Sequence, residues 1–270
     1  MPELPEVETI ANGLHKRVAG DRVESVWVGG KPEPLKSPAL EISRTLEGAE
    51  VERVRRVGKH IVFDLRSPKI PEGSQWIVHL GMTGRMLVAS PESELPRHTH
   101  LVAKLASGRE LRFVDPRRFG RLEVRHGGFS GPGAEPLQIT RLEFAELFHR
   151  SKAPIKAALL NQKLLHGVGN IYADEALFRA GIRPRRRANS LTRAELAKLH
   201  AGLQKVLQAA IAAGGSSISD YVDADGEAGY FQIQHRVYGR EGRPCLKCKR
   251  PVRKIVLGGR GTHYCLNCQK

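Results

Sequence analysis

Hydrophobic residues recur at helical spacing near the beginning of the chain. Within residues 5–16 a single apolar face is formed by Val7, Ile10, Ala11 and Leu14. Pro5 suits the first helical position, and Glu6 lies in the first turn, where the helix dipole favours a carboxylate. The spacing predicts one amphipathic helix over these residues, weakened at its end by Asn12 and Gly13.

The pattern then changes to that of short β-strands, as far as about residue 125. Apolar and β-branched residues gather in four segments separated by Gly, Pro and Ser turns: residues 22–28, 51–65, 75–88 and 100–114. In the last segment Ser107 and Gly108 suit a hairpin turn. The first half of the chain is therefore predicted to be mostly β, as a sandwich or a barrel.

Residues 126–136 are rich in glycine and proline and poor in apolar side chains, as expected for a linker. Beyond them the hydrophobic spacing becomes helical. Two capping boxes mark predicted helix starts: Thr140 with Glu143, and Thr192 with Glu195. Residues 169–182 predict a further helix with Asn170 as its N-cap, and Gly214 with Gly215 ends the helical part.

The charge balance indicates a polyanionic partner. The 270 residues include 44 Lys and Arg against 28 Asp and Glu, a formal net charge of +16. Because the cations recur from Arg17 to Lys270, nucleic acid is the favoured partner, and a merely soluble basic protein is the alternative. This length predicts two or more domains.

No apolar run approaches the ~20 residues that cross a bilayer. The first ten residues contain three glutamates and no leading basic segment. We therefore expect a soluble, intracellular protein without membrane contact.

The four cysteines have the spacing C-x2-C-x16-C-x2-C: Cys245, Cys248, Cys265 and Cys268. Four thiolates on two hairpin knuckles predict a closed, structural zinc site, and a redox role or two chance pairs is the alternative. Residues 252–264, between the knuckles, predict a hairpin. Its glycine-rich tip would project Arg260, which by itself is more often a phosphate contact than a catalyst.

The segment "FVDPRRFG", residues 113–120, places two arginines and an aromatic ring on a turn after a strand. Arg117 or Arg118 would bind phosphate or fill an emptied base position, and Phe119 would wedge between base pairs. The alternative is a β-turn whose phenylalanine packs inward. Met82 offers a second wedge, although methionine is usually core filler.

Two further basic positions have ordinary alternatives. His98 and His100 suggest a metal pair, but no third ligand lies near them in the sequence, so a surface or phosphate-contacting role is favoured. Lys59 begins a strand among basic residues and is by default a solvated cation.

The chain begins with Pro2 and Glu3 after the initiator methionine. If Met1 is removed, Pro2 carries a secondary amine beside a carboxylate. A free α-amine titrates at about pH 8, whereas a lysine side chain titrates at about 10.4, so the α-amine is the readier nucleophile at neutral pH. If Met1 stays, the nitrogen is an amide and cannot attack. The alternative is that both residues merely begin the helix.

Six motifs occur in the order of one known family: "PELPEVET", "LGMTG", "DPRRFG", "GVGNIYADEALF", "GYFQIQHRVYGR" and the four-cysteine motif. From Pro2 to Lys270 the chain resembles the bacterial formamidopyrimidine-DNA glycosylases. The resemblance implies an α+β fold in three parts. These are a β-sandwich flanked by helices over 1–130, a domain with a helix-two-turns-helix motif over 137–232, and a zinc-binding β-hairpin over 235–270.

The resemblance also implies a bifunctional DNA repair enzyme with one structural zinc ion. It would flip oxidised purines such as 8-oxoguanine and formamidopyrimidines out of double-stranded DNA, excise them, and cleave the abasic strand by β- and δ-elimination. Pro2 would be the nucleophile that forms a Schiff base with the sugar, and Glu3 would shuttle protons. We expect a monomer in the bacterial cytoplasm, associated with the nucleoid through DNA.

The remaining roles that the resemblance implies fall into three groups. Lys59 would serve β-elimination, and Arg260 would serve δ-elimination and bind the lesion phosphate. The DNA backbone would be gripped by His98, Lys152 and Asn170. The gap left by the extruded nucleotide would be filled by Met82, Arg117 and Phe119. Of these, Arg117 would face the orphaned base.

Residues 217–231 align with the loop that covers the flipped base in this family. They are acidic, so the tip, including Glu227, is expected to point away from phosphate. Two alternatives remain open from the sequence. One is the endonuclease VIII-like branch, which prefers oxidised pyrimidines. The other is a non-catalytic binder of damaged DNA, which would bind in a salt-sensitive way without cleaving.

Overall fold

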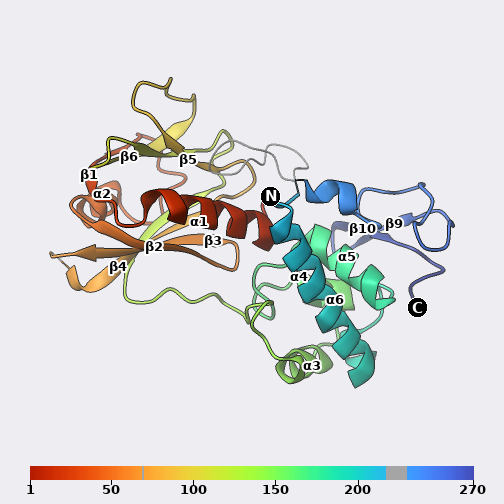
Figure 1. Ribbon diagram of the computed structural model, residues 1–270. Coiled ribbons are helices and arrows are strands. Elements are labelled where there is room, and N and C mark those ends of the chain that lie inside the picture. The colour runs from red at the N-terminus through yellow and green to blue at the C-terminus, as the bar shows by residue number, and fades with distance from the viewer. Residues whose placement is uncertain (69, 217–229) are drawn as a thin grey trace. The chain divides into compact units, whose positions relative to one another are not determined.

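In the computed structural model, the predicted N-terminal helix forms α1 (Leu4–Val18) (Figure 1). It continues through Asn12 and Gly13, where the sequence predicts weakening. The reason is burial, because Leu14 and Val18 extend the apolar stripe into the core and are completely buried. Tertiary packing here outweighs local helix propensity.

The structure describes residues 1–68, 70–216 and 230–270. The chain forms two units: unit 1 comprises residues 1–130 and 214–230, and unit 2 comprises residues 131–213 and 231–270. The helical segment and the four-cysteine segment thus share a unit, and the three-part division expected from the resemblance stays a prediction. Residues 217–229, with Glu227, lie outside the described residues.

Unit 1 contains two four-stranded antiparallel sheets in its described part. The first sheet has the order β1 (Val23–Val28), β6 (Thr99–Leu105), β7 (Glu110–Val114) and β5 (Arg85–Ala89). The second has the order β2 (Glu50–Val57), β3 (His60–Ser67), β4 (Ile70–His79) and β8 (Arg121–His126). The two separate sheets confirm the sandwich and not the barrel.

One hydrophobic core joins both sheets to α1 and to α2 (Ala39–Leu46). Its largest members are aromatic: Phe63 stacks on Trp76 of the neighbouring strand, with ring centroids 4.7 Å apart. Burying such side chains supplies the main driving force for the fold. The predicted hairpin turn is confirmed, because Gly108 has φ +83° between β6 and β7.

Unit 2 is built from helices and one hairpin. Its described elements are α3 (Arg141–His149), α4 (Ile155–Leu160), α5 (Asn170–Ala180), α6 (Arg193–Ala212), the short 3-10 turns η1 (Ala188–Ser190) and η2 (Phe231–Gln234), and the strands β9 (Arg253–Leu257) and β10 (Arg260–Tyr264). Both capping boxes are present, at Thr140 and Thr192. The helix α6 ends at Ala212, and its C-cap Ala213 precedes the glycine pair that predicts its end.

The C-terminus is fastened to the end of α5. The backbone N–H of Lys270 donates to the carbonyl of Gly181 at 2.8 Å, and the amide of Gln269 donates to the carbonyl of Ile182 at 2.9 Å. Gly181 has φ +72° and closes α5 in the left-handed conformation. Among the residues that the structure describes, no helix combines the length and apolar character needed to cross a bilayer.

Candidate functional site

The N-terminal pair Pro2 and Glu3 lies at the start of α1. Glu3 is the N-cap residue, and only 4% of it is exposed. Its backbone N–H donates to Oε2 of Glu6 at 2.8 Å, and Oε1 of Glu6 accepts the N–H of Ser216 at 2.8 Å. A buried carboxylate therefore lies one residue from the Pro2 nitrogen, at a helix end whose position is fixed by hydrogen bonds.

Lys59 lies in the two-residue turn between β2 and β3, where Gly58 has φ +58°. Only 7% of Lys59 is exposed, so its interpretation as a solvated cation is wrong. Arg56 ties this turn to α1, because its Nε lies 2.6 Å from a carboxylate oxygen of Glu8 and its Nη1 donates to the carbonyl of Gly58. The turn and the helix that carries Pro2 are thus joined.

Met82 and Phe119 lie on two turns of unit 1 whose backbones touch. A Cβ added to Gly81 would lie 2.5 Å from the carbonyl carbon of Phe119, so only glycine fits. Met82 is 44% exposed and Phe119 is 49% exposed, so neither side chain fills the core. The guanidinium of Arg117 lies 4.7 Å from the centre of the Phe119 ring. The two turns therefore present the three predicted gap-filling side chains from one region.

His98 and His100 have different surroundings. His98 is exposed and has φ +69°, whereas His100 is buried and its Nε2 donates to the backbone carbonyl of Asp115 at 2.9 Å. The described residues contain one group arranged to hold a metal ion, which consists of the four cysteines.

In unit 2, Asn170 and Arg260 belong to neighbouring segments. Asn170 is the first residue of α5 and Gly169 is its N-cap, so the prediction of Asn170 as N-cap is wrong. Instead the Asn170 amide donates to the carbonyl of Gly261 at 3.0 Å and so contacts the predicted hairpin, which is confirmed. Arg260 is the exposed first residue of β10, and Lys152 is exposed before α4.

The four cysteine sulfurs lie within 4.8 Å of one another. Cys245 and Cys268 are 3.9 Å apart, and Cys248 and Cys265 are 3.4 Å apart. A tetrahedral zinc ion with Zn–S bonds of about 2.3 Å places its ligands about 3.8 Å from each other, so the arrangement fits zinc. Burial and the neighbouring thiols raise the pKa of Cys268 to about 12, and a central dication would offset that cost of ionisation.

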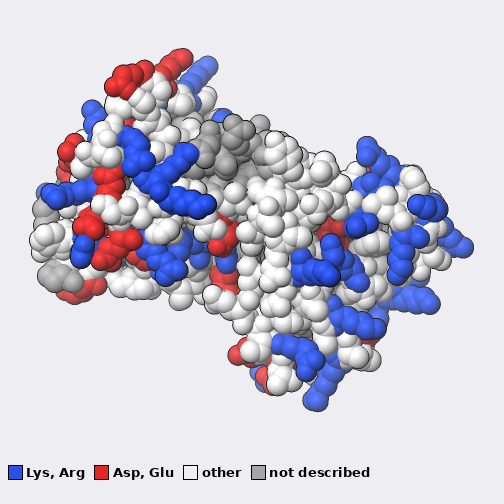
Figure 2. Space-filling view, viewed as in Figure 1, with Lys and Arg blue, Asp and Glu red and all other residues white. Residues whose placement is uncertain are grey.

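The segment around this site is strongly basic. Between Arg236 and Lys270 the sequence has a single acidic residue, Glu241. Figure 2 shows the Lys and Arg side chains that gather around the β9–β10 hairpin, whereas both signs of charge mix over the two sheets in the same view. A surface of this kind attracts phosphate groups.

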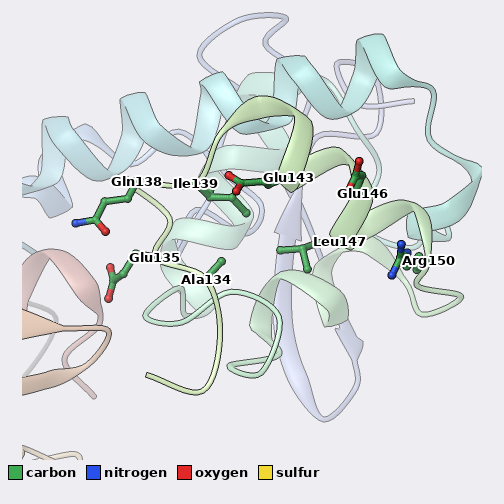
Figure 3. A pocket seen from close by; sticks show the side chains of 8 residues that line it. All are labelled: Ala134, Glu135, Gln138, Ile139, Glu143, Glu146, Leu147 and Arg150. Atoms are coloured by element: carbon green, nitrogen blue, oxygen red, sulfur yellow. The ribbon is translucent and has the colours of Figure 1, made fainter. Parts of the chain in front are cut away.

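A pocket of about 520 Å³ beside α3 has the opposite character (Figure 3). Glu135, Glu143 and Glu146 line it, with Glu135 at one end and Arg150 at the other. The Thr140 hydroxyl lowers the pKa of Glu143, so this carboxylate is ionised at neutral pH. The pocket is therefore unsuited to DNA phosphate and lies outside the site.

A buried ion pair that the sequence does not predict lies behind the hairpin. Lys156 Nζ lies 2.6 Å from a carboxylate oxygen of Asp174, and both residues have 0% exposure. Lys156 also donates to the carbonyl of Gly261 and the hydroxyl of Thr262, and Asp174 accepts the N–H of His263 at 2.8 Å. The pair thus fixes the strand that begins at Arg260.

The neighbouring Glu175 is a second buried tether. Its carboxylate accepts the successive backbone N–H groups of Arg236, Val237 and Tyr238 at 2.9–3.0 Å. Burial raises the pKa of Glu175, although these three donors oppose the rise. The sequence signal for either tether is a pair of acids in the middle of a helix that is mostly apolar.

Replacing Asp174 by asparagine is expected to lower the free energy of unfolding by about 3–5 kcal/mol, because Lys156 would stay buried without its counter-charge. Urea unfolding measures the loss, with zinc content recorded alongside. Glu195→Gln is the matched control. Its half-buried carboxylate pairs with Arg186, which lowers the pKa of Glu195 to about 2, and glutamine preserves the capping box. An equally small loss in both variants would contradict the structural role of the buried pair.

Comparison with known proteins extends over the whole chain. Sequence models match the formamidopyrimidine-DNA glycosylase N-terminal domain over residues 1–122, the H2TH domain of the same enzyme over residues 131–222, and the zinc finger found in FPG and IleRS over residues 242–270. The formamidopyrimidine-DNA glycosylase of Listeria monocytogenes serotype 4b is 39% identical over 279 residues, with both chains covered completely.

Two solved DNA complexes are similar over the full length of both chains. A Lactococcus lactis FPG mutant in complex with a Fapy-dG containing DNA has a TM-score of 0.89 and 32% identity. MutM in complex with carbocyclic 8-oxo-G containing DNA has a TM-score of 0.88 and 32% identity. Both similarities cover the sandwich, the helical segment and the hairpin together.

Proposed function

The chain belongs to the formamidopyrimidine-DNA glycosylase family, and we propose that it excises 8-oxoguanine and formamidopyrimidines from double-stranded DNA and then cleaves the strand at the abasic site. As a family member it is a DNA repair glycosylase with lyase activity, and its four cysteines form a structural zinc site. The proposal depends chiefly on the buried carboxylate of Glu3 beside Pro2. The lesions bound by the two similar DNA complexes support the substrate class.

The first step uses the amine that removal of Met1 would free on Pro2. Its lone pair attacks the sugar C1', and the bond from C1' to the base breaks with its electrons leaving on the base. The base takes up a proton while the nitrogen releases one. The bond between C1' and O4' then opens, Glu3 gives a proton to O4', and the nitrogen lone pair forms the cationic iminium.

The iminium then acts as an electron sink for two eliminations. Loss of a proton from C2' forms a carbon–carbon double bond and expels the 3' phosphate, and loss of the C4' proton expels the 5' phosphate in the same way. We assign the β-elimination to Lys59, and the δ-elimination and lesion phosphate to Arg260. The burial of Lys59 supports a role other than surface solvation.

The remaining side chains hold the DNA. Met82, Arg117 and Phe119 fill the space of the extruded nucleotide, since an enzyme that attacks C1' must take the base out of the stack. The backbone is bound by His98, Lys152 and Asn170. One chain acts on one duplex in this scheme, and the cell compartment is the bacterial cytoplasm, where the nucleoid lies.

A comparison of lesions tests this function against its two alternatives. Single-turnover cleavage of a duplex with 8-oxoguanine opposite cytosine is expected to be about tenfold or more faster than cleavage of a thymine glycol duplex. The reason is that an enzyme for oxidised purines binds the transition state of the purine more tightly than that of the pyrimidine. An undamaged duplex serves as the control.

Faster cleavage of thymine glycol would instead place the chain with the enzymes of oxidised pyrimidines. Salt-sensitive binding to both lesions without cleavage, by protein that lacks Met1 and holds zinc, would mean a reader of damage.

A further inference from the structure

Asp115 lies at the end of β7, in the motif whose arginine and phenylalanine are assigned to the DNA gap, and has 0% exposure. Its carboxylate accepts three hydrogen bonds. Oδ1 accepts the hydroxyl of Thr83 at 2.6 Å and the N–H of Arg117 at 3.2 Å, and Oδ2 accepts the N–H of Gly120 at 2.7 Å. Each donor lies on, or next to, a residue assigned to the wedge.

The backbone of Asp115 reaches a third segment. Its N–H donates to the carbonyl of His98 at 3.0 Å, and its carbonyl accepts Nε2 of His100 at 2.9 Å. One residue therefore joins the turn of Met82, the turn of Phe119 and the start of β6, where the assigned phosphate contact His98 lies.

Part of this arrangement is an ordinary turn. The bond from the Arg117 N–H to Oδ1 is an Asx-turn, which aspartate forms at many strand ends. The bonds to Thr83 and Gly120 go beyond it, because Thr83 lies 32 positions away along the chain. In the part of the chain that the structure describes, the Asp115 carboxylate pairs with no cation, so these neutral donors are what stabilise it in the interior.

The two turns are closely packed around Asp115. A Cβ on Gly120 would lie 2.5 Å from the Phe113 ring and 3.1 Å from Oδ2 of Asp115. The equivalent atom on Gly81 would meet the Phe119 backbone. The exposed wedge side chains thus extend from closely packed backbone that is hydrogen-bonded to Asp115.

We propose that Asp115 is the positioning residue that holds Met82, Arg117 and Phe119 as one pre-arranged wedge, so that loss of its carboxylate impairs extrusion of a paired nucleotide but not the chemistry at C1'. This inference rests on the wedge role assigned under the proposed function. Pre-arrangement matters because displacement by about 1 Å is enough to reduce a positioned reaction by up to about a hundredfold.

The test compares two substrates in the variant Asp115→Asn. An asparagine of the same shape can accept at one position only, so either Gly120 or Arg117 N–H meets an N–H group. Excision from an 8-oxoguanine duplex is expected to fall about tenfold. Borohydride trapping on a single-stranded abasic oligonucleotide, which needs no extrusion, is expected to stay within about twofold. A merely destabilised protein would lose both activities together.

Three further variants complete the experiment. Thr83→Val removes one hydrogen bond without changing shape and is expected to act in the same direction more weakly, so it serves if Asp115→Asn does not fold. Thr83→Ser keeps the hydroxyl and is expected to restore the duplex activity. Asp64→Asn is the matched control, since Asp64 accepts from Arg55 and Gln75 and contacts neither turn.

The outcomes separate this inference from its premise. If Phe119→Ala and Met82→Ala lose duplex excision while Asp115→Asn and Thr83→Val keep the wild-type ratio of the two activities, the positioning role of Asp115 is overturned alone. If Phe119→Ala and Met82→Ala also keep that ratio, the wedge assignment fails and this inference fails with it. If Asp115→Asn loses excision on the duplex but keeps trapping on the single strand, and Asp64→Asn keeps both activities, the wedge assignment and the positioning role of Asp115 are both supported.

Discussion

Replacing Pro2 with glycine is expected to lower excision of 8-oxoguanine and borohydride trapping by at least about a hundredfold. Glycine keeps a free α-amine of similar basicity, so the variant tests the ring and not merely the presence of nitrogen. The pyrrolidine ring fixes the direction of the lone pair, and a secondary amine yields a cationic iminium without gaining another proton. The backbone N–H of Glu3 donates to the carboxylate of Glu6, which fixes the start of α1. The direction of the Pro2 lone pair relative to Glu3 therefore depends on the ring.

The measurement is the yield of covalent protein–DNA band after borohydride reduction on an 8-oxoguanine duplex, with intact mass determined for each protein. Pro91→Gly, in an exposed loop, is the matched control and is expected to trap like the wild type. A protein that retains Met1 is expected to trap nothing, because its Pro2 nitrogen is an amide. A covalent band from a preparation whose intact mass shows Met1 throughout would refute Pro2 as the nucleophile.

The fold was largely predictable because its signals are local. Capping boxes at Thr140 and Thr192 need only residues three apart, and the hairpin turn at Gly108 needs only a positive φ. The errors arose where distant packing decides. Asn12 and Gly13 predict a weakened end of α1, yet the helix continues to Val18 because this side chain is buried in the core. Asn170 was assigned as an N-cap, yet its amide contacts the hairpin 91 positions away.

The site divides in the same way. Four cysteines within a short segment predict their own cluster, since the spacing itself builds the knuckles. Lys156 with Asp174, and Asp115 with Thr83, give no such signal, because a polar residue inside an apolar element is equally consistent with solvent exposure until its partner is known. The default interpretation of Lys59 as a solvated cation fails for this reason: a basic stretch predicts exposure, whereas the turn between β2 and β3 buries this side chain.

Zinc and the helical contacts of the hairpin make separable contributions to unit 2. Hydrogen bonds that need no metal hold the start of β10. Lys156 and Asn170 donate to the carbonyl of Gly261, and the carboxylate of Asp174 accepts the N–H of His263. The two knuckles meet through their four sulfurs, which lie within 4.8 Å of one another, so we expect their arrangement to depend on the metal. A structural zinc site contributes about 10–16 kcal/mol in isolated fingers, so its loss exceeds what these contacts can offset.

Replacing Cys248 with serine is therefore expected to release zinc, lower the melting temperature of the protein and weaken binding to lesion DNA by about tenfold or more, which corresponds to about 1.4 kcal/mol. Because the basic side chains between Arg236 and Lys270 are held by this segment, the loss should be accompanied by a shallower dependence of affinity on salt. Metal analysis, thermal unfolding and binding at several salt concentrations provide the measurements. Asn267→Ser, exposed between Cys265 and Cys268 in the other knuckle, is the control. Full affinity in protein shown to be free of zinc would mean that the contacts from Lys156, Asn170 and Asp174 alone orient the hairpin, and the metal would then have no part in DNA binding.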